Sequence, residues 1–311
     1  MSSSTVTPKT LTYVSGSSDF EQQLDLYLPS EQTASSLVVF IHGGAWRTGS
    51  RKDHADLAKY LCAKGKAVAI VDYRLSVKDD QGLPKHIHPV HVQDVNAALA
   101  FLHVRDDVPS KDWVVVGHSI GAWLTLAAII SGSSSSPDAQ YPAPMPTPSS
   151  AARDSIKTCV LVDGIFSVSG LLQEYPDYDG FVAQAFLPHP GPAEYDVVSC
   201  ENWPLAFDGK QLHVWHSCDD ELLSFKQSLD IILHLDSKLS TAASASIPVV
   251  IPQDGNASTT EVQGEKKLLA SLYANTSIKN ADQLHADLTT LKGAHDDLLH
   301  TETFWNLILA L

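Results

Sequence analysis

A serine flanked by glycines is the feature of this sequence best suited to covalent chemistry. Ser119 lies at the centre of Gly-His-Ser-Ile-Gly, residues 117–121, between the apolar run 114–116 and a stretch with helical spacing. A serine on a tight strand-to-helix turn exposes its hydroxyl, and the glycines avoid clashes across that turn. The N-terminus of the following helix also favours negative charge that develops nearby. The five-residue pattern is weak alone, but its setting predicts that Ser119 is a nucleophile.

A pair of glycines follows an earlier apolar run, residues 37–41. Gly43 and Gly44 lie in His-Gly-Gly-Ala-Trp, where the missing side chains let backbone N–H groups face a substrate. Taken alone, the pair fits a simple turn after a strand equally well. Because Ser119 follows one strand-helix-strand passage downstream, we expect the N–H groups of Gly43, Gly44 and Ile120 to form an oxyanion hole.

A nucleophilic serine needs an acid and a base, which in hydrolases of this kind follow it in the order acid, histidine. Three carboxylates, Asp219, Asp220 and Glu221, come directly after an apolar run. We favour Asp220, because in related hydrolases the acid lies a few residues past a strand end and just before the next helix. Asp219 is the second choice. Asp163, at the end of another apolar run, is a less favoured alternative that could instead fix a cap.

The base is expected on the loop before the C-terminal helix. The sequence has 14 histidines, so any single one is more often structural than catalytic. His295 lies after the last predicted strand and before the final helix, whereas His285 precedes that strand and His300 lies in or beside the helix. We expect His295 to take the proton of the serine and Asp220 to hold the tautomer of His295. Activity should then fall below about pH 6 as the imidazole protonates.

Strands and helices must alternate to bring these residues to one edge of a sheet. Apolar, β-branched runs suit strands buried on both faces, and leucines and alanines at helical spacing suit crossover helices. Predicted strands cover residues 11–14, 23–28, 37–41, 67–71, 114–116, 158–162, 212–215 and 288–291, and predicted helices cover residues 53–63, 91–103, 123–130, 222–239 and 303–311. With the Ser119 turn, this order resembles the α/β-hydrolase fold, an α/β class with a mostly parallel eight-stranded sheet and helices on both faces.

Three stretches interrupt the alternation, and we interpret them as additions to a single domain spanning residues 1–311. Residues 131–152 and 240–264 are rich in small and polar residues that bury little apolar surface, which predicts surface insertions. Residues 166–203 are instead rich in aromatic residues and proline. That composition predicts a small aromatic-rich cap region over the active site, or a surface excursion that merely packs its aromatic side chains.

Charge and cysteine content narrow the classes of partner. The formal net charge of −15 disfavours nucleic acid and anionic membranes, so we expect a small-molecule substrate. No spacing of Cys and His predicts a metal site, and we expect no cofactor. The four cysteines are isolated, and no apolar run has the length of a signal-peptide core or membrane span, which favours a cytoplasmic location. The sequence leaves the oligomeric state open, a homodimer included.

The motifs taken together resemble those of the kynurenine formamidases, and the fungal enzymes in particular. The Gly43-Gly44 loop is similar to that family's His-Gly-Gly-x-Trp, and the Ser119 turn is similar to its nucleophile turn. A more specific likeness lies in two motifs that generic esterases lack, Leu-Val-Asp-Gly-Ile-Phe-Ser at residues 161–167 and Glu-Tyr-Pro-Asp-Tyr-Asp at residues 174–179. The stretch that begins at His216 also resembles the family and favours Asp220 over Asp219. The resemblance covers about residues 37–130, 158–186, 212–228 and 288–299, and omits the two serine-rich insertions.

The resemblance implies hydrolysis of N-formyl-L-kynurenine to L-kynurenine and formate through a formyl-serine intermediate. This reaction belongs to tryptophan catabolism through kynurenine, a route that feeds NAD biosynthesis. The aryl and amino-acid part of such a substrate needs an aromatic pocket, for which Trp46, Phe166, Tyr175 and Tyr178 are candidates, although each could equally be packing. A carboxylesterase acting on small aryl or short-acyl esters and a catalytically inactive scaffold of the same fold are the alternatives.

Overall fold

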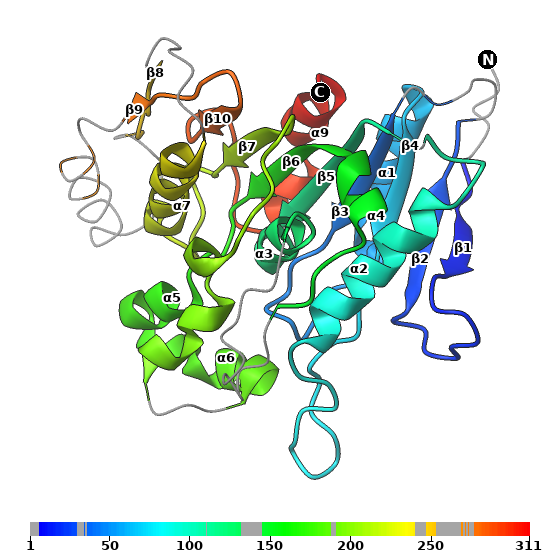
Figure 1. Cartoon of the computed structure of the whole chain (residues 1–311), viewed down its shortest axis with the longest axis horizontal. Coiled ribbons are helices and arrows are strands. Elements are labelled where there is room, and N and C mark those ends of the chain that lie inside the picture. The colour runs from blue at the N-terminus through cyan, green and yellow to red at the C-terminus, as the bar shows by residue number, and fades with distance from the viewer. Residues whose placement is uncertain are drawn as a thin grey trace.

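One mixed sheet forms the centre of the protein, with helices against both of its faces (Figure 1). This computed structural model describes residues 6–29, 34, 36–109, 111–131, 145–187, 191–239, 247–252, 269, 271, 273 and 277–311. The strands of the sheet are β1 (Lys9–Thr12), β2 (Gln23–Tyr27), β3 (Leu37–Ile41), β4 (Ala67–Val71), β5 (Trp113–His118), β6 (Ile156–Val162), β7 (Gln211–Trp215) and β10 (Leu284–Asp287). Within the described residues their order is β1-β2-β4-β3-β5-β6-β7-β10. Neighbours from β4 to β10 are parallel, and β2 pairs antiparallel with both β1 and β4. The predicted sheet is confirmed.

The two faces of the sheet have separate cores. Helices α1 (Ala55–Ala63) and α9 (Glu302–Leu309) pack on one face, and α2 (Val90–His103), α3 (Ile120–Ala127) and α7 (Phe225–Lys238) pack on the other. Strand β3 shows the division, because Val38 and Phe40 join the first core while Val39 and Ile41 join the second. Burial on both faces explains why such strands read as unbroken apolar runs. Among the described residues, the helices are too short or too polar to cross a bilayer.

Shorter elements complete the described chain. They are α4 (Ser150–Ser155), α5 (Val168–Glu174), α6 (Asp179–Phe186), the strands β8 (Ile247–Pro248) and β9 (Ser277–Ile278), and the 3-10 helices η1 (Arg51–His54), η2 (Pro176–Tyr178), η3 (Pro192–Val198), η4 (Cys200–Asn202) and η5 (Asp297–His300).

The last strand was predicted in the wrong place. Residues 288–291 form no strand, and β10 instead occupies the four residues before them, in register with β7. Strand β10 lies at the edge of the sheet, and only Leu284 of its four residues is buried, so its apolar signal is weak. Leu288 and Leu291 are buried in a loop that packs against the core, which explains why an apolar pattern pointed to them.

The described residues of 166–203 form a group of short helices that packs its aromatic side chains against the body of the protein, and its role as a cap over the site stays a prediction. It contains α5, α6 and three 3-10 helices, which lie on one side of the sheet near the C-terminal ends of the central strands (Figure 1). Phe181 and Phe186 of α6 contact Trp46, and Phe186 also contacts Trp123 of α3. Aromatic packing therefore attaches these helices to the body of the protein.

The two predicted insertions fall partly outside the described residues. In 131–152, residues 132–144 lie outside them, while Met145 is buried and α4 begins at Ser150. In 240–264, residues 240–246 and 253–264 lie outside them, while β8 pairs antiparallel with β9.

Candidate active site

The Ser119 turn joins β5 directly to α3. Ser119 has φ 54° and ψ −120°, a left-handed conformation that side chains rarely adopt, and α3 begins at Ile120 rather than three residues later as the periodicity predicted. Such strain persists only where the surrounding structure enforces it, and it often marks a functional position. The Ser119 hydroxyl makes no hydrogen bond within the described residues, and the residue is 7% exposed.

The glycines of the turn are required by close contacts. A Cβ at Gly117 would lie 2.1 Å from the carbonyl oxygen of Gly121 and 2.4 Å from Oγ1 of Thr125. A Cβ at Gly121 would lie 2.1 Å from the carbonyl oxygen of Ile41 at the end of β3. The two glycines therefore allow α3 to approach β5 and β3 closely.

This geometry predicts a large stability effect for Gly117→Ala. The added methyl group collides with backbone, which cannot move aside as a flexible side chain would, so we expect a loss of about 3 kcal/mol in the free energy of unfolding. Urea unfolding followed by circular dichroism measures it. Gly180→Ala in α6 is the matched control, because nothing lies within 4 Å of a Cβ there, and its effect should stay within about 1 kcal/mol. Equal stabilities for the two variants would contradict the prediction.

The Gly43-Gly44 loop packs directly against the serine. A Cβ at Gly43 would lie 2.9 Å from the Cβ of Ser119, and Gly44 has φ 100° with no room for a side chain beside Thr48. The hydroxyl of Tyr73 donates to the carbonyls of His42 and Gly43 at 3.0 and 3.1 Å. The N–H groups of Gly43 and Gly44 donate no hydrogen bond within the described residues. They are therefore available to an anion formed next to the serine.

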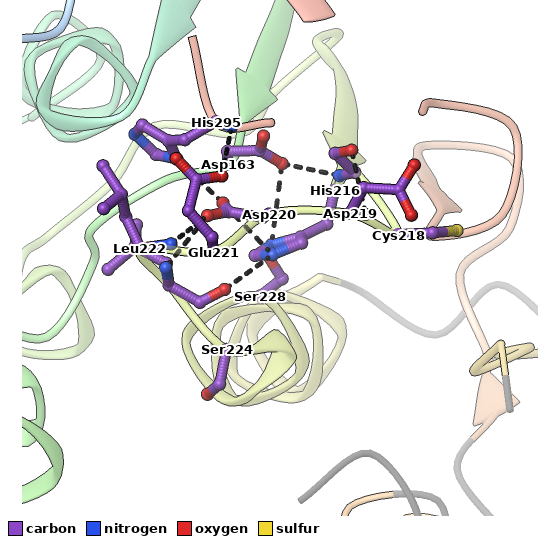
Figure 2. Close-up of polar contacts among 12 residues, drawn as sticks. Asp163, His216, Cys218, Asp219, Asp220, Glu221, Leu222, Ser224, Ser228 and His295 are labelled. Carbon is purple, nitrogen blue, oxygen red and sulfur yellow. Dashed lines mark hydrogen bonds and ion pairs between the residues drawn. The ribbon is translucent and has the colours of Figure 1, made fainter. Parts of the chain in front are cut away.

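Asp220 and His295 form a buried pair at the same edge of the sheet (Figure 2). Nδ1 of His295 lies 2.8 Å from Oδ2 of Asp220, while Oδ1 of Asp220 accepts the N–H groups of Leu222 and Leu223 at 2.8 and 3.0 Å. Burial alone would raise the pKa of Asp220, but the hydrogen bond and the nearby imidazoles outweigh it and hold the pKa below its usual value. Burial disfavours the imidazolium of His295, yet the hydrogen bond and charge of Asp220 dominate and raise the pKa of His295 to about 9.

The carboxylates of Asp219 and Glu221 instead hold the loop that carries His295. Oδ2 of Asp219 accepts the N–H of Gly293 at 3.1 Å, and Oε2 of Glu221 accepts the N–H of His295 at 2.9 Å. Of the three carboxylates, only that of Asp220 is hydrogen-bonded to the imidazole ring. Asp163, the remaining alternative, accepts the N–H of Ser217 at 2.7 Å and makes no hydrogen bond to His295 within the described residues.

His118 is a residue of the site that the sequence reasoning missed. Burial lowers the pKa of His118 well below its usual range, so the ring is neutral. Its Nε2 lies 2.9 Å from the carbonyl oxygen of His295, an arrangement in which the Nε2–H donates, and the two rings are 4.6 Å apart. The residue before the serine thus ties the His295 loop to the Ser119 turn. Its place next to Ser119 was the available signal.

The four aromatic candidates for substrate binding fall into two groups. Trp46 and Phe166 are fully buried among core side chains. Tyr175 and Tyr178 are half-buried, and their rings stack with centroids 5.0 Å apart. The Tyr178 hydroxyl donates at 2.9 Å to the carbonyl of Leu222, which lies in the loop after β7 that carries Asp220, called the acid loop below. The structure therefore places the two tyrosines beside the acid loop and the other two inside the core, and a role in binding substrate stays a prediction for all four.

The raised pKa of His295 changes the expected pH dependence. The sequence predicted a fall in activity below about pH 6, and the structure moves this fall to higher pH. A general base must be neutral, so kcat/KM should rise about tenfold per pH unit up to the pKa of His295, near 9. Burial lowers the pKa of His295, and the carboxylates of Asp220, Asp163 and Asp296 raise it by more. Initial rates between pH 5 and 10 give the pH–rate profile and the pKa of its acid limb. An acid-limb pKa at or below 6.5 would contradict a histidine whose pKa is raised by Asp220.

The order of the sheet and the strained serine between β5 and α3 place the protein in the α/β-hydrolase class. A family model described as BD-FAE matches residues 24–185. The kynurenine formamidase of Scheffersomyces stipitis is 32% identical over 225 residues, covering 66% of this chain and 80% of that enzyme. The kynurenine formamidase of Eremothecium gossypii is 34% identical over 207 residues, covering 64% of this chain and 78% of that enzyme. The chain belongs to the kynurenine formamidase family of hydrolases, as the sequence motifs predicted.

Solved structures agree on the fold. A truncated carbohydrate esterase from gut microbiota has a TM-score of 0.62 at 16% identity, covering 99% of this chain and 96% of the esterase chain. Esterase B from Lactobacillus rhamnosis has a TM-score of 0.58 at 21% identity, covering 75% of this chain and 72% of its own. At these identities the likeness supports the shared fold alone.

Proposed function

We propose that this chain hydrolyses N-formyl-L-kynurenine to L-kynurenine and formate. The observation that carries the proposal is the buried hydrogen bond between Asp220 and His295. A hydrogen bond from His118 to the carbonyl of His295 connects the loop of His295 to the Ser119 turn. The names of the fungal relatives supply the substrate. We further propose Ser119, Asp220 and His295 as the catalytic triad.

The proposed reaction gives each of these groups one role. Oγ of Ser119 attacks the formyl carbon while His295 takes the hydroxyl proton, and the carbonyl oxygen becomes an anion held by the N–H groups of Gly43, Gly44 and Ile120. Collapse of this intermediate breaks the C–N bond, and the proton on His295 passes to the leaving arylamine. A water molecule, activated by His295, then attacks the formyl-serine and releases formate.

The packing around Ser119 suits a small acyl group. The Gly43 backbone lies so close to Ser119 that a Cβ at Gly43 would meet the serine Cβ. Formyl is the smallest acyl group and has only a hydrogen beside its carbonyl, so it needs little space. The aryl and amino-acid part would extend away from Gly43, and the half-buried tyrosines Tyr175 and Tyr178 beside the acid loop are candidates to contact it.

A panel of three substrates tests the proposal on the full chain. N-formyl-L-kynurenine should give the highest kcat/KM, and N-acetyl-L-kynurenine, which adds one methyl group, should be slower by roughly 10- to 200-fold. Turnover of p-nitrophenyl acetate without cleavage of either kynurenine derivative would replace the proposal with a carboxylesterase. A wild-type chain that neither turns over any of the three nor reacts with a fluorophosphonate probe would indicate a catalytically inactive scaffold.

A further inference from the structure

A second histidine lies against the acid of the proposed triad (Figure 2). His216 follows β7 and is buried, and its Nε2 lies 3.5 Å from Oδ2 of Asp220, the oxygen to which His295 is bonded. We propose that His216 is a positioning residue of the site, which holds Oδ2 of Asp220 in place for His295. This inference rests on the proposed triad, since it assigns no contact between His216 and substrate.

The neighbours of His216 determine which of its nitrogens carries hydrogen. Nε2 faces the carboxylate of Asp220 and, at 3.2 Å, the carbonyl oxygen of Leu223. Neither group can donate a hydrogen, so Nε2 must be the N–H nitrogen. Nδ1 lies 2.8 Å from the hydroxyl of Ser228 in α7, which can donate to it. The ring therefore directs an N–H group towards Asp220.

His216 and Asp220 also hold the same short stretch of chain. The carbonyl of Leu223 accepts from His216, while the N–H of Leu223 donates to Oδ1 of Asp220 at 3.0 Å. Oδ1 of Asp220 is thus fixed by backbone, and Oδ2 is left to the two imidazoles. Loss of His216 would remove one of the two groups that define the direction of Oδ2.

A second carboxylate, that of Asp163, lies near the other nitrogen of His216, with its Oδ1 3.8 Å from Nδ1. One oxygen of Asp163, a ring nitrogen of His216 and one oxygen of Asp220 all lie within 4.8 Å of one another. Oδ2 of Asp163 is buried without a partner in the described part of the chain. Burial and the nearby charge of Asp220 raise the pKa of Asp163 well above its usual range, whereas the pKa of Asp220 is held below its usual value. Asp220 is therefore the anion towards which both histidines direct their N–H groups.

Three substitutions at His216 test the proposal in the full chain. Leucine removes both nitrogens, glutamine keeps an N–H donor near the position of Nε2, and asparagine keeps a polar group only near Nδ1. Because a displacement of about 1 Å at a catalytic group can cost on the order of 100-fold, we expect His216→Leu to lower kcat by about 100-fold with little change in KM. The low-field proton resonance of the His295 Nδ1–H should disappear with it. His216→Gln should restore most of kcat and the resonance, and His216→Asn should not.

Controls separate this role from simple support of the fold. His213→Gln changes a histidine within β7, which stacks on His285 at 4.6 Å, and should leave kcat unchanged. A His216→Leu variant with wild-type kcat and an intact resonance would overturn the proposal. If the leucine variant fails to fold, equal kcat values for the glutamine and asparagine variants would overturn it instead.

The test is independent of the proposed substrate. All rates are measured with p-nitrophenyl acetate as well as N-formyl-L-kynurenine, and the proton resonance requires no substrate. A wild-type chain that cleaves only the ester would therefore contradict the proposed function and still report on His216.

Discussion

Replacing Ser119 with alanine is expected to lower kcat by about 10⁶-fold, to the level left when the nucleophile of a serine hydrolase is removed. The hydroxyl that forms the acyl intermediate is gone, and no other described hydroxyl lies in the strained turn between β5 and α3. Stability should stay close to that of the wild type, because the Ser119 hydroxyl makes no hydrogen bond within the described residues. Initial rates on N-formyl-L-kynurenine and labelling by a fluorophosphonate probe measure the loss.

Two further variants make this result specific. Ser119→Gly should be equally inactive but more stable than Ser119→Ala by about 1 kcal/mol, because glycine adopts φ 54° without strain. Ser131→Ala changes a serine just beyond α3, whose hydroxyl donates to the carbonyl of Pro204 at 2.8 Å, and should keep full activity and labelling. A Ser119→Ala protein that still turns over or is still labelled would show that the nucleophile lies elsewhere.

Replacing Asp220 with asparagine is expected to lower kcat by about 10⁴-fold while the fold survives. Oδ1 of Asp220 accepts two backbone N–H groups, so the oxygen of an asparagine must take that position. The amide NH₂ then faces Nδ1 of His295 where Oδ2 was, and it forces Nδ1 to accept a hydrogen bond. The neutral imidazole must then carry its hydrogen on Nε2 and cannot take a proton from the serine.

Asp219→Asn is the matched control for this prediction. Within the described residues the carboxylate of Asp219 accepts only the backbone N–H of Gly293, and the oxygen of an asparagine can accept the same bond. Its effect on kcat should therefore be small. The pH–rate profile adds a second readout, because loss of the Asp220 charge should move the acid limb of any residual activity below that of the wild type. A crippled Asp219→Asn protein with a mild Asp220→Asn would reverse the assignment of the acid.

The sequence predicted some parts of the fold well because their signal is local. Strands β3 and β4 were predicted with their observed ends, since both are buried on two faces and appear as unbroken apolar runs. Strand β10 was missed because it lies at the edge of the sheet and only Leu284 of its four residues is fully buried. Helix α7 begins at Phe225, later than predicted, because Ser224 caps it and Asp220 binds the preceding backbone.

The sequence predicted the loops of the site and the contact between Asp220 and His295, but not the contacts around that pair. The acidic run and the loop around His295 were both expected at the carboxyl edge of the sheet, where the structure brings them together. Of the three adjacent carboxylates, one binds the ring of His295, one binds the backbone N–H of His295 and one binds the backbone N–H of Gly293. This division depends on the directions of the side chains in the turn that follows β7. The contributions of His118 and His216 depend in addition on a loop distant in sequence and on α7.

The strained serine between two glycines is the feature that sequence alone determined most completely. Its glycines are needed because α3 must approach β5 and β3 closely. This requirement is visible in the sequence as a motif of five consecutive residues. The pairing of Asp220 with His295 spans 75 positions in the chain, and only the parallel pairing of β7 with β10 places their loops side by side. Tertiary structure alone also decided that His216 lies against Oδ2 of Asp220 and that the pKa of Asp163 is raised, because burial and the distances between charged groups exist only in the folded chain.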